Sequence, residues 1–248
     1  MISYIDAHAH YQQEPLSEAS DHLQTAFAVG IQKIALGGTH PEDWKQQVQL
    51  QHQFPANIFT HFGLHPWWVE KYSRVEMEKI FEQLDSELPL VHGLGETGLD
   101  FYSEKRDPTR FEDQRFAFRE QIKLAIKHQK PMVLHIVHAH DEVMKILREE
   151  NAERVPLIIH RFSGNAENLK VYVKMGAYLS FHEGRSLMKE VPLHQLLLET
   201  DSNAKVHPGG WDIRPHYQKT AEIIGLPLEE LANKLAENFD KIGYSRSL

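Results

Sequence analysis

The chain contains no cysteine, which excludes both a disulfide framework and a thiolate metal site. Any metal ion must therefore be held by histidine and carboxylate side chains. Histidine is plentiful, with 17 residues in a chain of 248. The composition thus allows a metal site of histidine and carboxylate ligands and excludes one of thiolate ligands.

Long apolar runs are also missing. No segment approaches the roughly 18 apolar residues of a membrane span, and the N-terminal stretch MISYIDAHAHYQ lacks a basic region followed by an apolar one. We therefore expect a cytoplasmic protein that does not associate with membranes. No obligate protein partner is evident from the sequence.

An excess of positive charge is absent too, because the formal net charge is −8. Non-specific affinity for nucleic acid rests on lysine and arginine, so this chain is a poor candidate for it. Bound metal ions can still supply local positive charge at a site. A nucleic acid therefore remains possible as a substrate.

What is present is typical of a globular enzyme, with 41% hydrophobic and 25% charged residues. One domain spanning residues 1–248 is expected, because α/β barrels commonly have about this length. Eight short apolar runs read as strands: Ser3–Ala7, Lys33–Gly37, Ile58–Gly63, Leu90–Gly95, Met132–His135, Leu157–His160, Ala177–Phe181 and Leu196–Glu199.

Most of these runs are followed by segments with helical spacing. The expected helices are Leu16–Val29, Pro41–Gln53, Val75–Glu87, Arg110–His128, His140–Glu150, Ala166–Met175, Pro215–Ile224 and a closing helix from 228 to 239. Eight strand–helix units predict a closed (β/α)8 TIM barrel, and an open doubly wound sheet is the alternative. A barrel would carry its chemistry at the carboxyl-terminal ends of the strands.

Metal-ligating residue types stand at those ends. His8 and His10 share one side of the first run because strand side chains alternate, and Asp6 on the same side can orient an imidazole. Four further residues each follow an apolar run directly: Glu96, His135, His160 and Asp201. A barrel would bring all of these ends together.

Six ligands exceed what one catalytic zinc needs, since such a site typically takes about three protein ligands and a water. Two divalent ions that share a bridging carboxylate fit better, and Glu96 is the natural bridge. Imidazole with carboxylate suits Zn²⁺, Mn²⁺ or Co²⁺, with Mg²⁺ less suited to the histidine-rich end. Such a pair can activate water for hydrolysis.

Several blocks resemble the TatD-type metal-dependent hydrolases of the amidohydrolase superfamily. The blocks are DAHAH at 6–10, GLHP at 63–66, GETGLDFY at 95–102, Gln114 with Phe118 and Gln121, HRFSG at 160–164, and LETD at 198–201. The resemblance covers nearly the whole chain in order, and the block around Glu96 is the most specific. It implies a TIM barrel and a metal-dependent deoxyribonuclease, including 3′→5′ exonuclease activity on single strands or 3′ ends.

The resemblance also assigns the ligands to two ions. His8, His10, Glu96 and Asp201 would hold one, while Glu96, His135 and His160 would hold the other. Asp201 and Glu96 are the catalytic candidates, with Asp201 taking a proton from the attacking water. Substrate contacts are expected from four residues beyond the ligands: His65, Trp67, Tyr102 and Arg161.

The chain departs from the family pattern around the substrate. The family usually carries arginine two residues after the ligand at position 135, where this chain has Val137. Ser202-Asn203 and Arg214-Pro215 also differ from the usual loop residues. One hypothesis is that His138 or His140 replaces the missing cation, and the alternative is that both begin the next helix.

Three functions remain open at this stage. The first is a two-metal deoxyribonuclease, as the resemblance implies. The second is a metal-dependent hydrolase of a small-molecule ester, amide or lactone, which the acidic charge and Val137 favour, because the loops set barrel chemistry. The third is a binding protein whose barrel has lost its catalytic activity. The complete set of metal ligands argues against this third function.

Overall fold

Eight strands form one parallel sheet in which every strand pairs with the next one along the chain. The computed structural model describes residues 2–182, 184–202 and 211–243. The strands are β1 (Tyr4–Ala9), β2 (Ile31–Gly37), β3 (Ile58–Phe62), β4 (Gly93–Asp100), β5 (Met132–Val137), β6 (Leu157–Ile159), β7 (Tyr178–Phe181) and β8 (Leu196–Leu198).

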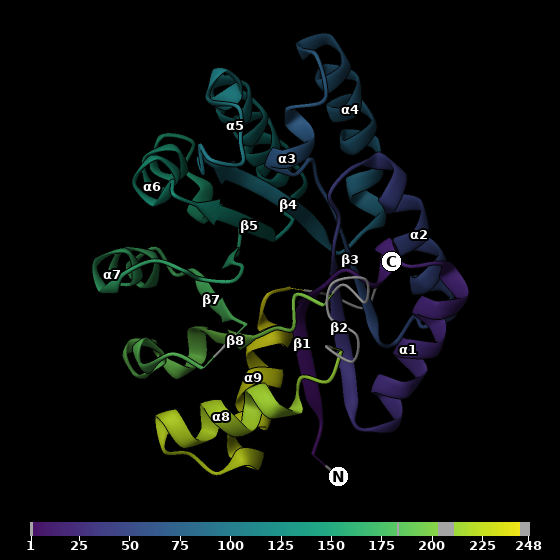
Figure 1. The fold of residues 1–248 in the computed structure, drawn as a ribbon, viewed down its shortest axis with the longest axis vertical. Coiled ribbons are helices and arrows are strands. Elements are labelled where there is room, and N and C mark those ends of the chain that lie inside the picture. The colour runs from purple at the N-terminus through teal and green to yellow at the C-terminus, as the bar shows by residue number, and fades with distance from the viewer. Residues whose placement is uncertain (1, 183, 203–210, 244–248) are drawn as a thin grey trace.

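Helices follow the strands and lie around the outside of the sheet, as Figure 1 shows. The α-helices are α1 (Leu16–Ala28), α2 (Pro41–Gln53), α3 (Pro66–Val69), α4 (Arg74–Glu87), α5 (Phe111–His128), α6 (His140–Glu149), α7 (Ala166–Lys174), α8 (Arg214–Ile224) and α9 (Leu228–Lys241). The short α3 was not expected from the sequence. None of the helices in the described ranges is long and apolar enough to cross a membrane.

The sheet closes between its first and last strands. Ala9 and Ser202 form a parallel bridge, and the amide of His10 donates to the carbonyl of Ser202 at 2.8 Å. The amide of Asp201 donates to the carbonyl of His8 at 2.9 Å. The TIM barrel predicted from the strand–helix repetition is therefore confirmed, and the open sheet is wrong.

Asp6 contributes to this closure rather than to the orientation of an imidazole. Its buried carboxylate accepts a hydrogen bond from the Thr200 hydroxyl at 2.6 Å, from the Thr200 amide at 3.0 Å and from the His8 amide at 3.2 Å. Burial raises the pKa of Asp6 to about 7, against the effect of the Thr200 hydrogen bonds. Asp6 thus ties β1 to the segment after β8.

The amphipathic helices bury the faces that the spacing of their apolar residues predicts. In α4 the buried residues are Met77, Ile80, Phe81 and Leu84, which lie three or four positions apart on one helical face. Ser73 caps this helix with Glu76 in a reciprocal capping box. Helix α9 buries Leu231, Leu235 and Phe239 and packs on β1 and β8.

The main misprediction concerns β4. The apolar run placed this strand at 90–95, ending before Glu96, whereas β4 extends to Asp100 and contains Glu96. Leu90 lies outside the strand and is 71% exposed. All eight residues of β4 are buried, including polar ones. Polar residues that face a buried site look like loop residues in the sequence.

Candidate metal centre

The six predicted ligands meet at one end of the barrel, although they come from distant parts of the chain. His8 lies in β1, Glu96 in β4 and His135 in β5. His10 and His160 come directly after strands β1 and β6, and Asp201 follows β8 after Glu199 and Thr200. All except His8 line one cavity of about 890 Å³, and His8 is fully buried beneath it.

Glu96 is the centre of the cluster, and its side chain is 2% exposed. Its Oε1 lies 3.1 Å from Nε2 of His10 and 3.4 Å from Nε2 of His8. Its Oε2 lies 3.3 Å from Nε2 of His160 and 3.7 Å from Nδ1 of His135. The two carboxylate oxygens therefore face two separate pairs of imidazoles.

Asp201 completes the first of these groups. Its Oδ1 lies 3.4 Å from Nε2 of His10, and its Oδ2 accepts a hydrogen bond from Arg161 at 2.8 Å. Imidazole and carboxylate atoms of His8, His10 and Asp201 all lie within 4.8 Å of one another. The same holds for His8, Glu96 and His160.

The donor atoms fit divalent metal ions. Nε2 of His8 and Nε2 of His10 lie only 3.2 Å apart, so two acceptor lone pairs would oppose each other unless a proton or a cation lay between them. Within the described residues, Nδ1 of the buried His8 has no hydrogen-bond partner. Neutral imidazoles around a shared carboxylate are ligands that Zn²⁺ and Mn²⁺ accept.

The electrostatics of the cluster also favour positive charge. Burial alone would raise the pKa of Glu96, but His8 and His160 lower it well below its usual range. Burial disfavours a charged His160, yet the carboxylates of Glu199 and Glu96 raise its pKa to about 9. Glu96 likewise raises the pKa of His10 against the effect of burial. The site therefore stabilises a proton or a cation between the Glu96 carboxylate and the imidazole nitrogens around it.

His65 joins the cluster from the loop before α3. Its Nε2 lies 3.9 Å from Oε2 of Glu96, and its Nδ1 accepts a hydrogen bond from the Trp67 amide at 3.1 Å. Burial and the neighbouring His135 keep the pKa of His65 well below its usual value, so the ring is neutral. A neutral ring that accepts at Nδ1 carries its proton on Nε2. The ligand atoms of His65, Glu96 and His135 lie within 4.8 Å of one another, but a ring protonated at Nε2 donates into the site instead of ligating a metal there.

Comparisons with known proteins agree with this geometry. The family model described as TatD related DNase matches residues 5–243. The chain belongs to the TatD family. It is a metal-dependent hydrolase with the barrel of the amidohydrolase superfamily.

Two relatives and one solved structure illustrate how close the TatD-family members are. The uncharacterized metal-dependent hydrolase YjjV of Escherichia coli K12 is 30% identical, over 95% of each chain. The crystal structure of YjjV, a TatD homolog, superposes with a TM-score of 0.84 over 98% of each chain at 27% identity. The 3'-5' ssDNA/RNA exonuclease TatD of Erwinia tasmaniensis is 28% identical, over 73% of this chain and 71% of its own.

Two carboxylates behind the cluster were not singled out as functional from the sequence. Oε1 of Glu199 lies 2.8 Å from Nδ1 of His160, on the side of the ring away from Glu96. Oδ2 of Asp100 lies 3.5 Å from Nε2 of His135. Partners of this kind hold a ligating ring in place and raise its basicity. Glu199 could have been found in the sequence, because it is an acidic residue directly after the apolar strand β8.

Replacing Glu199 with glutamine is expected to weaken metal binding by about 10–100-fold, because the amide orients His160 without a charge. Calorimetric titration of the metal-free protein with Mn²⁺ or Zn²⁺ measures this change. Glu190→Gln, an exposed site, is the matched control and should not alter the affinity. Unchanged affinity in Glu199→Gln would contradict the assignment.

Gly37 on β2 explains how His8 can fit. A Cβ atom on Gly37 would lie 2.1 Å from Cε1 of His8, well inside van der Waals contact. Gly37→Ala is therefore expected to displace the His8 ring and to lower the metal content of the purified protein. Elemental analysis of the purified protein measures this change in metal content. Gly176→Ala is unsuitable as a control, because Gly176 has a φ of 78° that an alanine would adopt only with strain. Gln32→Ala, at an exposed position on the same strand, is a better control.

The predicted substrate contacts divide into two groups. His65, Trp67 and Arg161 line the cavity together with Val137. Tyr102 is not among its described lining residues; its hydroxyl donates to Glu104 at 2.6 Å and its ring stacks on His138. Tyr102 therefore contacts His138, and its predicted contact with substrate stays a prediction.

The two histidines proposed to replace the missing arginine also separate. His138 lines the cavity, whereas His140 begins α6 and contacts the hydroxyl of Tyr172 at 3.2 Å. The replacement hypothesis therefore survives only for His138. Arg214 begins α8 and pairs with Asp212 at 2.7 Å, and Asn203 lies outside the described residues.

Proposed function

We propose that this TatD-family hydrolase holds two divalent ions and hydrolyses phosphodiester bonds of DNA, on single strands or from 3′ ends. The proposal rests on the position of the Glu96 carboxylate, because each of its two oxygens faces a different pair of histidines. The exonuclease named among the relatives supports the choice of substrate class.

The residues would hold the two ions in two sets. His8, His10 and Asp201 with Oε1 of Glu96 form the first, while His135 and His160 with Oε2 of Glu96 form the second. A bound pair of such ions activates water and stabilises both the attacking and the leaving oxygen of a phosphodiester.

Asp201 is the candidate proton acceptor. Burial alone would raise its pKa, but His10 and His160 lower it, so the carboxylate is ionised before reaction. Oδ2 already accepts a hydrogen bond from Arg161, which orients the group at the cavity wall. An ionised carboxylate held in this way can take a proton from the attacking water.

His65 and Arg161 are the candidate phosphate contacts. Nε2 of the neutral His65 ring lies 3.9 Å from Oε2 of Glu96 and can donate a hydrogen bond to a phosphate oxygen in the site. Arg161 is 57% exposed at its side chain, so it can pair with a phosphate while it holds Asp201. Both lie in the same cavity.

Backbone conformation supports a functional site at this end of the barrel. His138, Arg161 and Asp201 have φ of 53°, 46° and 49°, and each lies within the first few residues after β5, β6 or β8. Such conformations cost about 1–3 kcal/mol at a non-glycine residue and cluster at functional sites.

A substrate panel tests the proposal. Metal-loaded protein is incubated with single-stranded and duplex oligonucleotides, a phosphomonoester, a carboxylic ester, an amide and a lactone. The proposal predicts release of nucleotides from the single strand at a rate above all the non-phosphate substrates. Faster turnover of any carboxyl compound would replace it with the second candidate.

That second candidate is hydrolysis of a small-molecule ester, amide or lactone. Two observations favour it: Val137 puts an apolar side chain into the cavity where the family pattern has a cation, and the chain carries a net charge of −8. The same panel separates the two. If the protein bound two ions but hydrolysed no substrate in the panel, a binding protein that has lost catalytic activity would be indicated instead.

A further inference from the structure

The cavity extends well beyond the metal centre. Its described lining includes Thr39 and His40, which precede α2, together with Trp68 in α3 and Lys71 after that helix. Its volume of about 890 Å³ is near the upper end for small-molecule pockets, which hold about 300–1,000 Å³. There is room for more of a substrate than its reacting group.

Lys71 is held at this wall by a stack of rings. The His40 ring lies flat on Trp68, with centroids 3.6 Å apart and planes 13° apart. Nζ of Lys71 lies 3.7 Å from the Trp68 centroid, which places it on the opposite face because His40 covers the first one. Such a cation–aromatic contact helps to hold the ammonium group at this position.

The His40 ring is in turn fixed from behind. The Thr39 hydroxyl and Nδ1 of His40 lie 2.9 Å apart, and Asp43 accepts from the Thr39 amide at 2.9 Å and from its hydroxyl at 2.6 Å. Nε2 of His40 lies 3.8 Å from the exposed Glu42. His40 is therefore a support for Trp68, and Lys71 is the group that faces the cavity with its charge.

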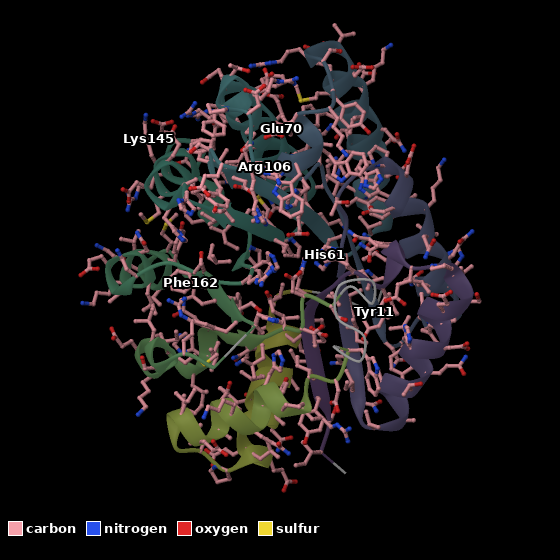
Figure 2. The ribbon with its side chains drawn as sticks, viewed as in Figure 1. Tyr11, His61, Glu70, Arg106, Lys145 and Phe162 are labelled. Atoms are coloured by element: carbon pink, nitrogen blue, oxygen red, sulfur yellow. The ribbon has the colours of Figure 1, made fainter. Side chains whose placement is uncertain are left out.

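The charge of Lys71 is available to a ligand. Among the described residues, no carboxylate lies within ion-pair distance of Lys71. The neighbouring Arg106 differs, because it lies 3.7 Å from Glu70 and 3.6 Å from Asp100; Figure 2 shows Glu70 and Arg106 together near α3. The local acid Glu70 thus already has a partner.

An exposed aromatic ring lies on the same short helix. Trp67 is 46% exposed and lines the cavity, with its indole nitrogen donating to Asp100 at 2.5 Å. Sites for single-stranded nucleic acid combine cations along the backbone with aromatic rings on which bases stack. The Arg106 guanidinium already lies over the Trp67 ring, 4.5 Å from its centroid, so Lys71 and the remaining exposed part of Trp67 supply one group of each kind beside the metal centre.

We propose that Lys71, held on the stacked rings of Trp68 and His40, binds a second phosphate of a polynucleotide whose scissile phosphate lies at the metal centre. Trp67 offers a stacking surface for a base of the same strand. The inference rests on the proposed function, and it specifies that the substrate is a strand rather than a mononucleotide ester.

Two substrates test the proposal in the metal-loaded protein. One is a short single-stranded oligothymidylate, and the other is the p-nitrophenyl ester of thymidine monophosphate, which has one phosphodiester and no second phosphate. Lys71→Met should lower the ratio of kcat/KM for the strand to that for the ester by about tenfold, because one charge-assisted contact is lost. The change should appear in KM.

Binding provides a readout that is independent of turnover. Fluorescence anisotropy of the labelled strand, in the presence of a chelator, gives the dependence of log Kd on log salt concentration. Lys71→Met should reduce the slope by about 0.7, the value for one phosphate contact on a single strand. Lys71→Arg should retain both the ratio and the slope, and Lys79→Met, an exposed lysine in α4, is the matched control.

An unchanged ratio and slope in Lys71→Met would overturn the inference, as would an equal loss on both substrates. If the wild-type protein hydrolysed neither phosphodiester, the proposed function would fail. The salt slope would then still decide whether Lys71 contacts a phosphate.

Discussion

Glu96→Ala is expected to remove bound metal from both halves of the site and to lower hydrolysis by at least about 1,000-fold, beyond the 10–100-fold typical of an outer partner. The reason is geometric, because the two oxygens of Glu96 lie between His8 with His10 on one side and His135 with His160 on the other. No other carboxylate among the described residues stands between these pairs. Metal content per chain and kcat/KM on the preferred substrate measure the effect.

Two variants make this result specific. His65→Ala should lose activity yet keep its metal, because the proton on Nε2 excludes that ring from ligation. His194→Ala, an exposed histidine far along the chain, should change neither quantity. Thermal unfolding shows whether each variant is folded. A folded Glu96→Ala protein that kept its full metal content would contradict the bridging role.

Removal of metal by a chelator is expected to reduce phosphodiester hydrolysis to the background rate, and addition of Mn²⁺, Mg²⁺ or Zn²⁺ should restore it. The same treatment should lower the melting temperature. A ligand at 1,000 times its Kd stabilises the folded state by about 4 kcal/mol, which corresponds to about 8–16 °C for a chain of this size. Differential scanning calorimetry with and without metal measures the shift.

Glu96→Ala is the control for the calorimetry, since a protein without the bridge should melt at the same temperature in either condition. Full activity of the wild-type protein in excess chelator, with metal content verified as negligible, would show that catalysis does not depend on the site.

The fold could be predicted because it rests on repetition. Each strand–helix unit carries its own apolar run and amphipathic spacing, so errors at one boundary, such as the misplaced start of β4, did not alter the count. The metal cluster could be predicted for a related reason. His8, Glu96 and His160 lie at the ends of apolar runs, and a barrel brings such ends together.

Features that depend on orientation could not be predicted. Whether His65 ligates or donates is decided by the Trp67 amide at its Nδ1, a contact that requires the α3 turn. Asp6 has the same spacing as the two ligands but points its carboxylate at Thr200. The role of Lys71 follows from a stack of two rings, one from His40 before α2 and one from Trp68 in α3.

Anomalous diffraction from crystals grown with Mn²⁺ tests the central claim most directly. The account predicts two peaks about 3.5–4 Å apart, with Glu96 between them, His8, His10 and Asp201 around one, and His135 and His160 around the other. A single peak, or a pair that Glu96 does not bridge, would contradict it.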